Sequence, residues 1–285
     1  MSLLRKRFLE DLRIRHYADK TVDAYVRCAA KFAQFFGKSP DLLGAEEVRE
    51  YQKHLTEKEV SRSTFAQTTS ALRFLYGVTL KRKDMVEWIP YGRRETRLPV
   101  VLSQEELGKL FEAVENLKCR TVLMTQYGAG LRLGEALGLK VTDLDSQRMM
   151  IRVVQGKGRK DRYVELPPSL LEELRNYWKV YRPKSWLFPS SEGDHPIHKT
   201  AVQKACKAAR LRAGLTKPAT THTMRHCYGT HQLEAGKDLR TIQLRMGHSS
   251  LHTTALYLHV AAGAENTTTK AVDLLERVRA KKRKG

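Results

Sequence analysis

The sequence is poor in cysteine and has no long apolar run. Its four cysteines are far apart and form no C-x-x-C pair: Cys28, Cys119, Cys206 and Cys227. This spacing excludes a zinc ribbon or a disulfide framework, so we expect each to be a small buried side chain. No apolar run approaches the roughly 20 residues of a membrane-spanning helix. The start, M-S-L-L-R-K-R, also lacks the apolar core of a signal peptide.

Acidic residues are few relative to basic ones. The chain of 285 residues has 31 Asp and Glu against 52 Lys and Arg, which leaves a net charge of +21. Such an excess implies a polyanionic partner, and nucleic acid is the first choice. The basic residues are spread along the chain and not gathered on one amphipathic helix, which argues against a membrane surface. We therefore expect a cytoplasmic, nucleoid-associated protein.

The first third of the chain is predicted to be a helical domain, residues 1–92. It shows no alternation of apolar and polar residues, which would indicate strands. Apolar residues instead recur at helical spacing from Thr21 to Phe36, from Glu46 to Leu55 and from Thr64 to about Leu80. Residues 93–102 follow, with three arginines and a proline, and this composition favours an extended linker.

Residues 103–285 are predicted to form a second, α+β domain. Ser103-Gln104-Glu105-Glu106 is a capping box that begins a helix. Two short β-rich runs, Met150 to Gln155 and Arg162 to Leu166, flank the turn residues G-K-G-R-K-D, which is typical of a hairpin. Helical patterns lie on both sides of it. The predicted fold is mainly α with a small antiparallel β-sheet in the second domain.

Two groups of basic residues are candidate DNA contacts. In the first domain they are Arg73, Lys81, Arg82 and Lys83, and at the hairpin tip they are Arg159 and Lys160, next to Lys157. A basic run is by itself also typical of a solvated face, so both interpretations stay open.

The segment from Thr221 to His259 concentrates chemically useful side chains. It reads T-H-T-M-R-H-C-Y-G-T-H, then R-M-G-H-S-S, then T-T-A-L-Y-L-H. His222 and Arg225 are three residues apart and fall on one helical face. Tyr257 follows near the end of the segment.

Two further candidate site residues, His248 and Arg132, stand out because of a neighbouring glycine and a neighbouring acidic residue. Gly247 suits the C-terminal cap of a helix from Asp238 to Met246, which places His248 in the turn after it. Upstream, G-L-R-L-G-E puts Arg132 and Glu135 three residues apart on a predicted helix, so the acid can orient the guanidinium. Alone, the second pattern is also typical of an ion pair on the surface.

Together these side chains suit the breakage of a phosphodiester. A tyrosine is only about one thousandth ionised at pH 7, so Tyr257 as a nucleophile needs a proton acceptor. His222 fits this role because imidazole titrates near neutrality. Arg132 and Arg225 can hold the non-bridging oxygens in bidentate geometry as charge builds on them.

Two more residues complete the set. His248 can add a hydrogen bond to the phosphate, and Lys157 can give a proton to the leaving 5′ oxygen if neighbouring arginines lower its pKa. His222 and His226 also have the spacing of metal ligands, but an arginine lies between them and no acidic or cysteine cluster is near. We expect neither a metal nor a cofactor.

The arginine, the lysine, His-x-x-Arg, Gly-His and the tyrosine resemble, in this order, the pattern of the tyrosine recombinase (phage integrase) family. Arg225 to His248 is 23 residues and His248 to Tyr257 is 9, within T-T-x-x-Y-x-H. The resemblance implies DNA cleavage and rejoining through a covalent 3′-phosphotyrosyl intermediate that conserves the ester energy without ATP. It implies these catalytic and supporting roles: Arg132, Lys157, His222, Arg225, His248 and Tyr257 as catalytic residues, and Glu135 and His259 as supporting ones.

The first domain is similar in layout to the family's core-binding domain, which would close with the catalytic domain as a C-shaped clamp around the duplex. The family also implies a homotetramer on two DNA duplexes, with or without a paralogous recombinase. The chain departs from the family pattern at Met224, Met246 and Gly229, where leucine, leucine and a small alanine are usual. We expect none of these departures to touch the chemistry.

Other interpretations stay open at this stage. A type IB topoisomerase would use similar chemistry to relax supercoils, but the separate helical domain and the short length favour a recombinase. A catalytically silent DNA-binding protein of the same fold would not need the complete polar set. There is no room for an arm-binding domain before Leu3 or for an insertion between Pro189 and His222, so we expect a compact Xer-type layout. The tail after Tyr257 favours a mobile element.

Overall fold

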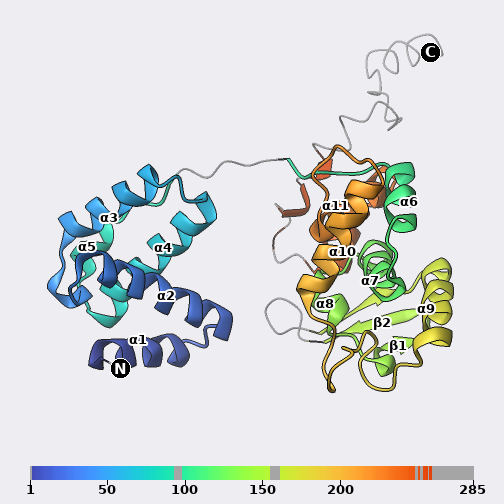
Figure 1. Ribbon diagram of the computed structural model, residues 1–285, viewed down its shortest axis with the longest axis horizontal. Coiled ribbons are helices and arrows are strands. Elements are labelled where there is room, and N and C mark those ends of the chain that lie inside the picture. Colours follow the sequence, from blue (N-terminus) through green and yellow to red (C-terminus); the bar gives the residue numbers. More distant parts are fainter. Residues whose placement is uncertain are drawn as a thin grey trace, which may run out of the picture. The chain divides into compact units, whose positions relative to one another are not determined.

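The computed structural model divides the chain into two compact units, Met1–Thr96 and Arg97–Gly285. It describes residues 2–92, 98–154, 161–247, 250, 253–255 and 257–258. Of the predicted linker, residues 93–97 lie outside this description, and residues 98–102 form no helix or strand. The predicted fold, mainly α with one small antiparallel sheet, is confirmed (Figure 1).

The first unit is a helical bundle, blue to teal in Figure 1. Its elements are α1 (Leu3–Ile14), α2 (Asp19–Phe36), η1 (Pro40–Leu42), α3 (Ala45–Glu57), α4 (Arg62–Phe74), η2 (Leu75–Thr79) and α5 (Lys83–Glu87). The helix predicted from Thr64 to Leu80 is α-helical only to Phe74, because the chain then widens into the π-helical turn η2. α2 packs against α4, and Phe32 and Leu72 are fully buried between them and their neighbours.

In the second unit, most of the helices pack around one central helix, α7 (Leu117–Ala129). Its helices are α6 (Gln104–Glu112), α7 (Leu117–Ala129), α8 (Leu133–Leu137), η3 (Val141–Asp143), α9 (Pro168–Tyr181), α10 (Lys199–Arg212), α11 (Thr221–Glu234) and α12 (Leu239–Met246). α7 contacts α6, α8, α9, α10 and α11. Its sequence places apolar and small residues on all sides, which suits a helix covered all round.

The sheet of the second unit has the order β1-β2-β3 and is antiparallel throughout. Its strands are β1 (Leu144–Asp145), β2 (Met150–Val153) and β3 (Arg162–Glu165), and β1 was not predicted. Ile151 pairs with Leu144 on one side and with Val164 on the other. Ile151 and Val164 belong to the unit's core, so the sheet is fixed by its buried face.

Several local predictions are confirmed by hydrogen bonds and burial. The capping box at the start of α6 has both bonds: the amide of Glu106 donates to Ser103 Oγ at 3.1 Å, and the amide of Ser103 donates to Glu106 Oε2 at 2.7 Å. All four cysteines are buried and free. Among the described residues, no helix combines the length and the apolar character that a bilayer crossing requires.

Candidate active site

Arg225 is the most deeply buried of the predicted catalytic side chains that the structure describes, with 1% of its surface exposed. It lies in α11, one turn after the helix begins. Its Nη1 donates to the carbonyl oxygen of Gly130, and its Nη2 donates to that of Met246. Burial and the nearby charge of Arg132 lower the pKa of Arg225 to about 10, so the guanidinium still carries its charge at neutral pH.

Arg132 and Glu135 lie at the start of α8, where Arg132 is the N-cap residue and Glu135 the third helical residue. The amide of Arg132 donates to Glu135 Oε2 at 2.9 Å, and its Nη1 donates to Oε1 at 2.7 Å. The acid therefore orients the guanidinium, as predicted, because the N-cap geometry brings both groups of Arg132 onto one carboxylate.

Arg162 is a third arginine on the same carboxylate, and sequence reasoning missed it. At the start of β3, its Nη1 donates to Glu135 Oε1 at 3.1 Å and its Nη2 to Oε2 at 2.8 Å. Nothing in the spacing of the sequence relates a residue after a hairpin to an acid 27 positions earlier. Only the fold shows the connection, because β3 packs against α12 and the side chain of Arg162 reaches Glu135 on α8.

Glu135 is the shared centre of these arginines, and its side chain is 8% exposed. Arg225 Nη1 lies 3.8 Å from its Oε2. Burial alone would raise the pKa of Glu135, but hydrogen bonds from Arg162 and Arg132 outweigh it and hold the pKa at about 2. Three guanidiniums and one carboxylate form what we call the arginine cluster (Arg132, Arg162, Arg225 and Glu135). It keeps a net positive charge that suits an anion.

The arginine cluster also holds the C-terminal end of α12. Three consecutive carbonyl oxygens there each accept a bond from one arginine: Arg245 from Arg162 Nε at 3.2 Å, Met246 from Arg225, and Gly247 from Arg132 Nη2 at 3.2 Å. These are the carbonyls that a helix end leaves without partners, and its dipole is negative there. Gly247 has φ 63°, so its predicted place as the residue that ends α12 is confirmed.

Two histidines on α11, His222 and His226, lie within reach of the charge of Arg225, and His226 also contacts the tyrosine. The rings of His222 and His226 are 4.5 Å apart and nearly perpendicular. Desolvation by neighbouring atoms and the charges of Arg225 and Arg132 lower the pKa of His222, although part of this side chain is exposed. Burial, His222 and Arg225 lower the pKa of His226 to about 4, so His226 is neutral at pH 7.

Tyr257 is 3% exposed and packs with Tyr228, Ile242 and Met246. Its hydroxyl lies 3.3 Å from Nδ1 of His226, although His222 was the histidine predicted to take its proton. Burial raises the pKa of Tyr257 to about 12, while the charges of Arg225 and Arg132 act in the opposite direction. The phenol is therefore protonated in the described conformation.

Gly229 has a role that the sequence did not indicate. A Cβ atom at this position would lie 2.6 Å from Cε2 and 2.8 Å from Cδ2 of the Tyr257 ring. Real Cβ atoms do not come so close, so the ring sits where it does because residue 229 has no side chain. The expectation that the departure at Gly229 leaves the chemistry unaffected stays a prediction, and the structure adds that this glycine lies against the ring of the predicted nucleophile.

The remaining predicted site residues divide into two groups. Lys157, Arg159, Lys160, His248 and His259 lie outside the described residues. In the first unit, Arg73 Nη1 donates to the carbonyls of Val86 and Ile89, and its guanidinium lies 4.9 Å from the ring centre of Tyr91. These contacts hold the guanidinium of Arg73 within its own unit, and its predicted contact with DNA stays a prediction.

The other three candidate DNA contacts of the first unit lie on its surface: Lys81, Arg82 and Lys83. Arg82 donates to the carbonyl oxygens of Asp41 at 2.7 Å and Leu43 at 3.1 Å. Lys81 and Lys83 are exposed. Their predicted contact with DNA stays a prediction.

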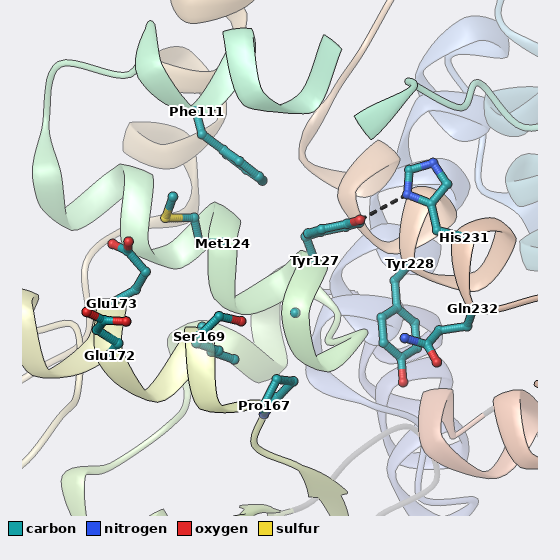
Figure 2. Close-up of a pocket in the computed structure, with 12 residues that line it drawn as sticks. Phe111, Met124, Tyr127, Pro167, Ser169, Glu172, Glu173, Tyr228, His231 and Gln232 are labelled. Carbon is teal, nitrogen blue, oxygen red and sulfur yellow. Dashed lines mark hydrogen bonds between the residues drawn. The ribbon is translucent and has the colours of Figure 1, made fainter. Parts of the chain in front are cut away.

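A separate hollow of about 420 Å³ lies on the second unit, bounded by residues of α7, α9 and α11. Two residues that line it are hydrogen-bonded: the hydroxyl of Tyr127 lies 3.0 Å from Nδ1 of His231. Figure 2 shows these two side chains facing one another. No predicted catalytic residue lines this hollow, so it is separate from the candidate active site. Among the described residues, no three His, Cys, Asp or Glu side chains gather as a metal site would require.

Comparison with known families matches both units. The phage integrase family matches residues 100–263, and the N-terminal SAM-like domain of phage integrases matches residues 4–84. The y4qK protein of Sinorhizobium fredii, assigned as an integrase/recombinase, is 47% identical over 97% of this chain and 91% of its own length.

Two further relatives carry recombinase names. The tyrosine recombinase XerC of Pediococcus pentosaceus is 31% identical over 86% of this chain and 89% of its own. The crystal structure of the XerH site-specific recombinase bound to its palindromic difH substrate has a TM-score of 0.69. It is 24% identical and covers 84% of this chain and 76% of that one, and it shows the same fold.

Proposed function

The chain belongs to the phage integrase family and is a tyrosine site-specific recombinase, and from this premise we propose that it breaks and rejoins DNA through a covalent 3′-phosphotyrosyl bond at Tyr257. One observation carries the proposal. Two guanidiniums, those of Arg132 and Arg225, share the carboxylate of Glu135, and their charges reach Tyr257. An anion-binding centre beside a tyrosine hydroxyl suits transfer of a phosphoryl group onto that hydroxyl.

In the first step the oxygen of Tyr257 attacks the scissile phosphorus. A bond forms between the phenolic oxygen and phosphorus, and the bond from phosphorus to the 5′ oxygen breaks. His222 or His226 accepts the phenolic proton, and the hydrogen bond to Tyr257 favours His226 as the first acceptor. The 5′ oxygen takes its proton from Lys157.

The arginine cluster stabilises the charge that develops on phosphorus. Arg132 and Arg225 direct N–H groups at the non-bridging oxygens, and His248 adds one hydrogen bond. Because protein bonds hold these two guanidiniums before DNA arrives, positioning them costs little free energy during the reaction. The ester energy is kept in the phosphotyrosyl bond, so a 5′ hydroxyl of a second strand can reverse the step without ATP or metal.

Tyr257 must leave its buried position before it can reach a phosphate, because it is 3% exposed. We therefore propose that the Tyr257 side chain moves away from Gly229 and His226 after DNA has bound. The DNA phosphate brings a negative charge near the histidines, which favours a protonated imidazole and so favours proton transfer.

The decisive experiment looks for the covalent intermediate. The protein is incubated in EDTA with nicked random-sequence duplexes, adducts are separated on a denaturing gel, and the trapped DNA is sequenced. We expect adducts with the wild type, none with Tyr257→Phe, and equal DNA binding by both. Adducts formed by the variant, or a wild type that binds DNA and forms none, would contradict the proposal. A parallel reaction without EDTA is the comparison, and adducts that form there but not in EDTA would contradict a metal-free mechanism.

We also propose that four copies of the chain act on two DNA duplexes, alone or with a paralogous recombinase, and that they integrate, excise or resolve a DNA segment. Mass photometry with the recognition site recovered above tests the assembly. Four protomers per two duplexes is the expected result, and a stable complex of one protomer that exchanges strands would contradict it.

A further inference from the structure

We propose that Arg162 is a positioning residue for strand cleavage, which fixes both the carboxylate that orients Arg132 and the end of α12. The inference rests on the proposed function and adds a residue to it. None of the motifs described above includes Arg162. Its contacts single it out among the described arginines as one that joins the sheet to the arginine cluster.

The first contact is a two-pronged bond to Glu135. Both Nη atoms of Arg162 donate to the two carboxylate oxygens, at 3.1 Å and 2.8 Å. Such a fork fixes the plane of the carboxylate as well as its distance, which a single ammonium does not. The same carboxylate plane sets the direction of Arg132, whose Nη1 donates to Oε1 at 2.7 Å.

The second contact is to α12. Nε of Arg162 donates to the carbonyl oxygen of Arg245 at 3.2 Å, next to the carbonyls held by Arg225 and Arg132. Arg162 therefore completes a row of three guanidiniums on three successive carbonyls. This row sets where α12 ends, immediately before His248 in the sequence.

Arg162 acts on the site through these groups, and the affinity measurement below distinguishes this role from a direct contact with DNA. Its Nε and both Nη atoms already donate to protein oxygens, and its side chain is 14% exposed. A lysine at 162 would keep the charge but could not make all three bonds. A glutamine would lose the charge as well.

The charge of Glu135 is the second quantity that Arg162 controls. The charged groups that face Glu135 are Arg132 on its own helix α8, Arg162 from β3 and Arg225 from α11. Arg162 contributes the largest of the hydrogen-bond effects that lower the pKa of this carboxyl. Without Arg162, burial works against the charged form, and Arg132 loses part of its anchor at acid pH.

The test compares Arg162→Lys with a matched arginine on the neighbouring strand. Arg152 on β2 pairs with Asp143 at 3.1 Å and lies away from the arginine cluster, so Arg152→Lys is the control. The rate of adduct formation at saturating DNA, DNA affinity and melting temperature are measured for each. We expect Arg162→Lys to slow adduct formation about 10- to 100-fold, the effect of a small misplacement of catalytic groups, with unchanged affinity.

Two results would overturn the inference from these measurements. One is cleavage by Arg162→Lys at the rate of Arg152→Lys. The other is a fall in DNA affinity that accounts for the whole loss of rate, which would make Arg162 a DNA contact.

A second measurement needs no DNA. Titration of the Glu135 carboxyl by ¹³C NMR should give a pKa of about 2 in the wild type. In Arg162→Gln it should rise toward about 4.3, the ordinary glutamate value. An unchanged value in Arg162→Gln would overturn the inference even if the wild type forms no adduct. Absence of wild-type adducts, with the expected titration, would instead count against the proposed function.

Discussion

The two units of this protein use arginine in different ways. In the helical unit, Arg73 and Arg82 each bond to two main-chain carbonyls near the surface. In the second unit, three arginines bond to three successive carbonyls and also meet at the carboxylate of Glu135. The second arrangement is buried, and each of its members depends on the others.

This difference separates two kinds of interaction with DNA. Charges on a surface are screened by salt and contribute nearly independently to attraction. Charges held in a buried network act as a unit, since removing one member leaves the others desolvated without a partner. We therefore expect changes in the arginine cluster to affect reaction and folding strongly, and changes in the helical unit to affect binding modestly.

The largest effect should come from Glu135→Gln, which removes the shared negative charge. Three guanidiniums then face one another without compensation, so stability should fall by about 3–5 kcal/mol. Cleavage by the folded fraction should fall by about 100-fold, because Arg132 is no longer oriented. Urea unfolding and adduct rates measure the two effects. The matched change Asp143→Asn, at a buried carboxylate paired with Arg152, should cost stability and leave the cleavage rate per folded molecule unchanged.

The next effect is the dependence of stability on pH, to which His226 should contribute and an exposed histidine should not. The pKa of His226 in the fold is about 4 against an ordinary 6.5, so the folded state resists protonation. The resulting stability is complete above pH 6.5 and is lost as pH falls toward 4. At about 1.4 kcal/mol per pKa unit it amounts to at most about 3 kcal/mol.

Urea titrations between pH 7 and pH 4 check this expectation. His226→Gln should flatten the loss of stability on acidification, whereas the same change at the exposed His195 should not. Equal acid sensitivity of His226→Gln and the wild type would refute the assignment.

Gly229→Ala should have a smaller effect on stability. It tests whether the absence of a side chain at residue 229 fixes the position of the Tyr257 ring. The added methyl group would lie 2.6 Å from the ring, so the ring must move, at a cost of about 1–3 kcal/mol. We expect the pKa of Tyr257, followed by ¹³C NMR, to fall from about 12 toward its ordinary 10 as the ring becomes exposed.

Gly108 in α6 provides the matched control, because a Cβ there meets nothing within 4 Å. Gly108→Ala should stabilise the protein by about 0.5–1 kcal/mol and leave the tyrosine unchanged. If Gly229→Ala behaves in the same way, the ring does not depend on the missing side chain.

The smallest effect should come from the helical unit. Lys81→Gln and Lys83→Gln remove exposed charges, and a variant that no longer neutralises one phosphate should show a slope of log K against log salt that is smaller by about 0.9. Affinity at moderate salt should fall only a few-fold. Lys53→Gln, at a lysine paired with Glu57 in the same unit, is the control and should leave the slope unchanged. Identical slopes for all three variants would show that this basic run does not bind phosphates.

Features that depend on residues close together in the chain were predictable from the sequence. Ser103 and Glu106 cap a helix, Arg132 and Glu135 pair across three positions, and Gly247 ends α12, because these contacts follow from local backbone geometry. The order and spacing of Arg132, His222, Arg225 and Tyr257 likewise sufficed to indicate the family.

Contacts between groups far apart in the chain became visible in the folded structure alone. Arg162 bonds to Glu135 over 27 positions and to Arg245 over 83, and Tyr257 bonds to His226 over 31. No periodicity connects such residues, since their contact depends on how β3, α8, α11 and α12 pack. The sequence named His222 as the proton acceptor from its motif, whereas packing brought His226 to the tyrosine and made room for its ring at Gly229.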